Sequence, residues 1–216
     1  MNNLPKISIF VFLLLPLISA LISLGIPIYR SDYMIFTVII YVGYALLLFI
    51  VKGISSLKGE KEWFPKFAGY ATFTAFAFFY IMPLIKVFED KIGIQFLLIV
   101  IWLVLHIICF VKVETFYKIV LPRASEPNSK WSIVYYLTII VLVAMAGGGN
   151  FRVTRIMTET YGQNPTMAYF SFVMYVVGIW LGTLAAVMSI GMQGKMPEER
   201  FERKVRKRKL NRNKEG

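Results

Sequence analysis

A run of glycines followed by arginines near residue 150 is the first candidate for binding chemistry. The candidate residues are Gly147, Gly148, Gly149, Asn150, Arg152, Arg155 and Glu159. Each glycine lowers helix propensity by about 1 kcal/mol relative to alanine, so the run favours an unwound backbone. Unwound backbone beside guanidinium groups would suit an anionic ligand in an outward-facing pocket. The alternative is a glycine helix end whose arginines reach lipid phosphates.

The single histidine and the single cysteine form a second candidate pair. His106 and Cys109 are three residues apart, which places them on one face of a helix. A thiol beside an imidazole is the pairing of a cysteine nucleophile with its base, but no third residue is available to orient the imidazole. A zinc site would need further ligands, and no GxSxG, HExxH, P-loop or GxGxxG motif occurs. We therefore expect a non-enzymatic protein without a metal or cofactor, in which His106 and Cys109 are intramembrane polar residues.

Small residues recur along the last apolar segment. Gly178 and Gly182 have the spacing of a GxxxG motif, and Ala185 and Ala186 follow them. Such a flat strip lets a second helix backbone approach closely. We expect helix packing at these four residues, either within the chain or against a partner.

The last residues form a strongly basic tail. Six of the seven residues from 203 to 209 are basic, namely Arg203, Lys204, Arg206, Lys207, Arg208 and Lys209. Each basic side chain near an anionic membrane surface contributes about 1 kcal/mol of attraction. Because a tail fixed at the membrane meets lipid headgroups first, we expect lipid contacts there and no nucleic acid.

All of these candidate residues lie in or next to six long apolar segments. The segments cover residues 7–28, 33–51, 67–85, 92–111, 131–149 and 166–191, without one Asp, Glu, Lys or Arg among them. At about 1.5 Å of rise per residue, each is long enough to cross a hydrocarbon core of roughly 30 Å as a helix. Backbone groups in lipid must be satisfied within their own segment, which favours helices. The sequence therefore predicts an all-α, six-helix transmembrane domain over residues 1–191 and a basic cytoplasmic tail over 192–216.

The distribution of positive charge predicts the orientation of the chain. Of the 24 Lys and Arg residues, nineteen lie at the N-terminus, in the second and fourth loops, and in the tail. The other side holds five, namely Arg30, Lys86, Lys91, Arg152 and Arg155. The positive-inside rule then places both termini in the cytoplasm. The composition suggests a multi-pass protein of a bacterial plasma membrane.

Two classes of function fit these features better than a third, an intramembrane hydrolase that would use His106 and Cys109. Small size and packing-type glycines favour a non-enzymatic accessory protein, either a subunit of a membrane complex or a toxin-immunity protein. The alternative is a solute-binding or permease subunit that takes its energy from a partner, since the segments lack acidic residues for ion coupling. In length, helix number and orientation the chain is similar to the substrate-binding subunits of energy-coupling-factor importers and to small ABC-exporter permeases. Expected partners are anionic lipids at the cytoplasmic face and a membrane protein or a second copy of the chain.

Overall fold

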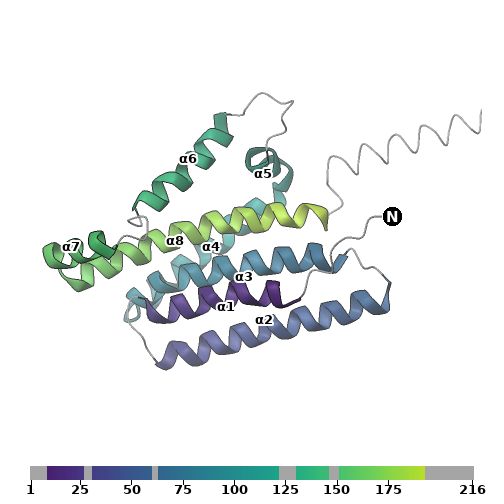
Figure 1. Ribbon diagram of the computed structural model, residues 1–216, viewed down its shortest axis with the longest axis horizontal. Coiled ribbons are helices and arrows are strands. Elements are labelled where there is room, and N and C mark those ends of the chain that lie inside the picture. The colour runs from purple at the N-terminus through teal and green to yellow at the C-terminus, as the bar shows by residue number, and fades with distance from the viewer. Residues whose placement is uncertain (1–8, 27–30, 60–62, 122–129, 146–150, 193–216) are drawn as a thin grey trace, which may run out of the picture.

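The computed structural model describes residues 9–26, 31–59, 63–121, 130–145 and 151–192, and it is built of helices without strands in these ranges (Figure 1). Six longer helices coincide with the six apolar segments: α1 (Ile9–Gly25), α2 (Ser31–Leu57), α3 (Trp63–Val87), α4 (Ile92–Val111), α6 (Lys130–Met145) and α8 (Gln163–Met188). Two shorter helices, α5 (Val113–Val120) and α7 (Phe151–Tyr161), lie in the connections, and a 3-10 turn, η2 (Ser189–Gly191), follows α8. The predicted all-α fold is confirmed for these residues.

Four helices are long and apolar enough to cross a membrane, namely α2, α3, α4 and α8. The apolar helices α1 and α6 are shorter than such a span in the part of the chain described. Large apolar side chains cover the outer faces of α2 and α4, as on helices that face lipid. The bundle is therefore compatible with a membrane protein, while the crossing of all six segments and the location of the termini stay predictions.

Helix α3 is central to the bundle and contacts α1, α2, α4 and α8. Figure 1 shows α3 between α1 and α8. The contact between α3 and α8 is the most extensive, because Gly178 brings the two backbones together. A Cβ atom at Gly178 would lie 2.7 Å from Ile81 Cγ2 and 2.9 Å from the carbonyl oxygen of Ala77.

A proline inside α1 determines how this helix is attached to α2 and α3. Pro16 has no N–H, so the carbonyl of Phe12 loses its normal partner within the helix. The hydroxyl of Tyr44 on α2 donates to this carbonyl at 2.8 Å. Thr72 on α3 lies 3.5 Å from the same oxygen and 2.8 Å from the Tyr44 hydroxyl. Side chains from two neighbouring helices thus replace the missing backbone hydrogen bond.

The ammonium of Lys86 holds the other end of α1. The charge count places Lys86 in an outer loop, but the structure places it in the last turn of α3, where its side chain is only 5% exposed. Its Nζ donates to the carbonyl oxygens of Ser23, Leu24 and Ile26 at 2.7, 3.0 and 2.7 Å. Carbonyls at a helix C-terminus lack backbone partners and carry partial negative charge, so they suit a cation. The assignment of Lys86 to a loop is wrong because α3 continues beyond the apolar segment.

Candidate functional site

Of the glycine–arginine candidates, only Arg155 and Glu159 have side chains in the described part of the chain. Residues 147–150 and the side chain of Arg152 lie outside the described part of the chain. Arg155 and Glu159 lie on α7, 80% and 61% exposed, with Arg155 Nε 2.7 Å from Glu159 Oε1. The loop expected to hold these residues therefore contains a surface helix, on which Arg155 pairs with a carboxylate one turn away.

His106 is hydrogen bonded to a tyrosine. Its Nε2 lies 3.2 Å from the hydroxyl of Tyr70 on α3, and its ring stacks on Trp102 at a centroid distance of 5.4 Å. Cys109 is buried one turn further along α4. Among the described residues, no group of three His, Cys, Asp or Glu side chains is placed to hold a metal ion. This arrangement is that of a polar contact between α3 and α4.

The small residues of α8 pack against the chain's own helices. Gly178 faces α3, and a Cβ atom at Gly182 would lie 3.3 Å from His106 Nδ1 on α4. Ala185 and Ala186 are fully buried. This strip is therefore occupied inside the chain, as the intramolecular interpretation expects. The six basic tail residues lie outside the described part.

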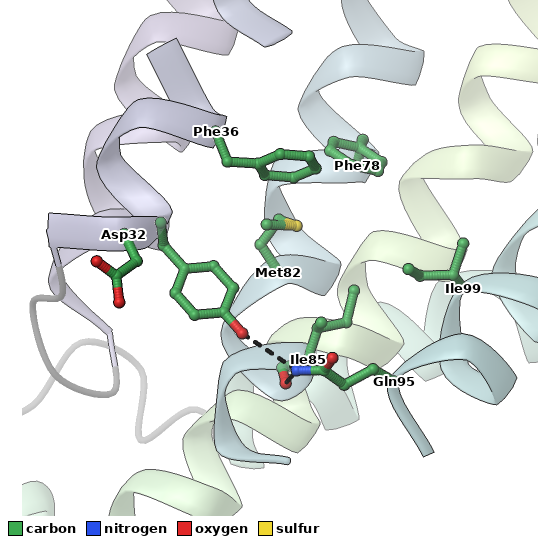
Figure 2. A pocket seen from close by; sticks show the side chains of 8 residues that line it. Asp32, Phe36, Phe78, Met82, Ile85, Gln95 and Ile99 are labelled. Carbon is green, nitrogen blue, oxygen red and sulfur yellow. Dashed lines mark hydrogen bonds between the residues drawn. The ribbon is translucent and has the colours of Figure 1, made fainter. Parts of the chain in front are cut away.

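A pocket that the sequence did not indicate lies between α2, α3 and α4 (Figure 2). Its volume is about 280 Å³. It lies at the end of the bundle where α2 begins, α3 ends and α4 begins, close to Lys86. The lining residues are Asp32, Tyr33, Phe36, Phe78, Met82, Ile85, Gln95 and Ile99.

Gln95 organises the polar end of this pocket. Its Nε2 donates to the hydroxyl of Tyr33 and to the carbonyl oxygen of Ile85, both at 3.1 Å. The two amide hydrogens are thus engaged, which leaves Oε1 as an acceptor and the Tyr33 hydroxyl hydrogen as a donor. Lys86 Nζ lies 5.9 Å from the centre of the Tyr33 ring, within reach of a cation–π contact. Asp32 also lines the pocket on the α2 side, and Figure 2 shows its carboxylate directed away from Gln95.

The rest of the pocket is apolar. Met82 and Ile85, which are 3% and 5% exposed, form its floor on α3. Figure 2 shows Phe36 of α2 and Phe78 of α3 facing one another beside Met82. Phe36 and Ile99 are 46% and 37% exposed, so the pocket borders on the outer surfaces of α2 and α4. A polar end joined to an apolar floor at a helix surface suits an amphiphilic molecule.

One compositional signal could have pointed to this pocket. Gln95 is the single Asn or Gln residue inside the six apolar segments. A buried amide in lipid needs partners, which makes it a marker of a polar contact. Its partners, Tyr33 and the carbonyl of Ile85, come from two other helices.

The comparisons with known proteins add no relative. No protein-family model matches the chain, and no curated protein or solved structure matches it. The functional conclusion therefore rests on the geometry of the pocket.

Proposed function

We propose that this chain is a multi-pass, non-enzymatic protein of a bacterial plasma membrane that binds an amphiphilic molecule of the bilayer in the α2–α3–α4 pocket. The observation that supports this function is the junction of the Gln95–Tyr33 polar end with the apolar floor formed by Met82 and Ile85. Among the two classes drawn from the sequence, it favours a solute-binding subunit that takes its energy from a partner. An accessory subunit of a membrane complex could carry the same pocket.

The lining residues support binding without catalysis. The polar groups are one carboxylate, one amide and one phenol, which can make several directed hydrogen bonds. Serine, cysteine and histidine, the usual nucleophiles and bases, are missing from the residues that line this pocket. The Tyr70–His106 pair is separate from these residues and belongs to the contact between α3 and α4.

The proposed orientation places the pocket in the outer leaflet. With both termini in the cytoplasm, α2 begins and α3 ends at the outer side of the membrane. An amphiphile would then lie with its polar group at the outer interface and its hydrocarbon chain beside Phe36 and Ile99. In this proposal the basic tail contacts anionic lipids at the opposite, cytoplasmic face.

A mutation at the edge of the pocket tests this function. Ile99→Trp places an indole against the pocket from a partly exposed position, so the bundle should still fold. Ile101→Trp is the matched control, because Ile101 is 39% exposed on the same helix and does not line the pocket. Each protein is isolated in native-membrane nanodiscs, and bound molecules are identified by mass spectrometry.

We expect the wild type and Ile101→Trp to retain the same amphiphile in stoichiometric amount, and Ile99→Trp to lose it. Equal retention by Ile99→Trp would show that the molecule binds elsewhere. A wild-type protein that retains no amphiphile would also contradict the proposal.

A further inference from the structure

We infer that the start of α2, residues 32–36, is a lid over the α2–α3–α4 pocket, and that the hydrogen bond between Tyr33 and Gln95 holds this lid closed. This inference rests on the proposed function, because it describes how a molecule of the bilayer enters the same pocket. It follows from the uneven packing of α2, from the lining of the pocket and from the helices that Gln95 joins.

Helix α2 is packed unevenly along its length. It lies along one edge of the bundle and contacts α1 and α3 (Figure 1). Buried side chains follow one face of the helix from Thr37 onward, at Tyr44, Leu48 and Val51, with spacings close to whole helical turns. In contrast, no side chain over residues 32–36 is buried. Because segments with few buried contacts open most readily, the lid can move outward while the rest of α2 stays packed.

The lid supplies one wall of the pocket. Asp32, Tyr33 and Phe36 line the pocket from α2, and the other lining residues belong to α3 and α4. Met82 on the floor is 3% exposed, whereas Phe36 on the lid is 46% exposed. Outward movement of the lid would therefore widen the pocket and uncover the Met82 side chain.

Gln95 joins the lid to α3 and α4. Its Nε2 donates to the Tyr33 hydroxyl and to the Ile85 carbonyl oxygen, both at 3.1 Å. When the lid moves outward, the bond to Tyr33 breaks while the bond to Ile85 can remain, so the amide keeps its place. The Tyr33 hydroxyl and the released amide hydrogen can then bond to the polar group of the entering molecule. A hydrogen bond of this kind favours the closed lid by about two- to tenfold.

A thiol on the pocket floor reports whether the lid opens. Met82→Cys places this thiol on α3, and the buried Cys109 of α4 reports opening of the whole bundle in the same molecule. The full-length protein in phosphatidylcholine nanodiscs is treated with N-ethylmaleimide, and labelling of each cysteine is followed by mass spectrometry. At low reagent concentration the labelling rate follows the equilibrium between the closed and the open lid.

Tyr33→Phe tests the bond that holds the lid. This change removes the hydroxyl that accepts from Gln95 and keeps the aromatic ring beside Lys86. We expect the labelling rate at position 82 to rise by about two- to tenfold, which is the bias that one such hydrogen bond supplies. The labelling rate of Cys109 should stay the same.

Two further variants show whether the effect belongs to this bond. Tyr41→Phe is the matched control, because it removes a hydroxyl of the same helix outside the lid, 3.3 Å from the Leu13 carbonyl oxygen of α1. It should leave the labelling rate at position 82 unchanged. Gln95→Leu removes the donor, and should raise that rate at least as much as Tyr33→Phe. The two changes together should give about the larger single effect, since both remove one bond.

The outcomes separate the lid from the proposed function. Faster labelling at position 82 alone supports the lid. An unchanged rate at position 82 in Tyr33→Phe would overturn the inference, and so would equal acceleration at Cys109, which indicates a looser bundle. The labelling needs no added amphiphile. A wild-type protein that retains no amphiphile would therefore contradict the proposed function and leave the lid in place.

Discussion

Replacing Gly178 with alanine should force α3 and α8 apart. The new Cβ atom would lie 2.7 Å from Ile81 Cγ2 and 2.9 Å from the carbonyl oxygen of Ala77. These distances fall short of the 3.4 Å of an ordinary contact by about 0.7 and 0.5 Å. The Ile81 side chain can rotate, but the Ala77 oxygen belongs to the backbone. Relief therefore requires a shift of a whole helix.

The size of the effect follows from two opposing contributions. Overpacking of this kind destabilises a protein by about 1–3 kcal/mol. Alanine regains up to about 1 kcal/mol of helix propensity over glycine. Because one of the two clashing atoms is backbone, we place the overpacking cost in the upper part of its range, at about 2–3 kcal/mol, which leaves a net loss of about 1–2 kcal/mol for Gly178→Ala. Gly69→Ala on α3 is the control, because a Cβ atom there meets nothing within 4 Å, and it should be neutral or stabilising.

The chain supplies its own reporter for this experiment. Cys109 is the single cysteine and is buried, so a thiol-reactive fluorescent dye should label it only when the bundle opens. At about 2–4 °C per kcal/mol for a chain of this size, Gly178→Ala should lower the midpoint of dye reaction by roughly 2–8 °C. Gly182→Ala should fall between Gly178→Ala and Gly69→Ala, since its nearest neighbour is a ring nitrogen of His106 at 3.3 Å. A midpoint for Gly178→Ala equal to that of Gly69→Ala would refute the close-packing explanation.

Three further substitutions test other contacts by the same thermal assay. Lys86→Met keeps the aliphatic stem but leaves carbonyls at the end of α1 without their donor, so it should destabilise the protein by about 1–3 kcal/mol, whereas the exposed Lys91→Met should not. Tyr44→Phe should lower the free energy of unfolding by about 1 kcal/mol. The loss should be smaller in a Pro16→Ala background, because alanine restores the backbone N–H that donates to Phe12. Equal losses in both backgrounds would contradict the idea that Tyr44 replaces this backbone donor. Arg155→Ala removes an exposed ion pair worth about 0.2–1 kcal/mol at most, and should leave the midpoint nearly unchanged.

The helices could be predicted from the sequence because lipid-compatible segments are continuous in the chain. The segment over 92–111 has the bounds of α4. Helices α2 and α3 extend beyond their predicted segments at both ends, and α8 begins three residues before its segment. The extensions carry polar residues that a hydropathy pattern assigns to loops. For the same reason α7, with its threonines, Arg155 and Glu159, was expected to be a loop.

The pocket could not be predicted, because its polar atoms meet across long intervals of the chain. Gln95 stands out as a lone amide, but its bond to Tyr33 joins residues 62 positions apart. The hydropathy pattern likewise ends one residue before Lys86, and the carbonyls that make its burial favourable belong to another helix. Gly178 was visible as part of a packing motif, but its neighbours on α3 were not.

The attachment of Lys86 to the end of α1 also concerns the order of events during synthesis. The carbonyls of Ser23 and Ile26 precede their ammonium partner by 63 and 60 residues. At about 5–20 residues per second, a ribosome needs roughly 3–12 s to cover that interval. During this interval the carbonyls at the end of α1 must accept hydrogen bonds from water or from the insertion machinery. This end of α1 therefore gains its ammonium partner only after α3 has been made, whereas the carbonyl of Phe12 in the same helix can already accept a hydrogen bond from Tyr44 of α2.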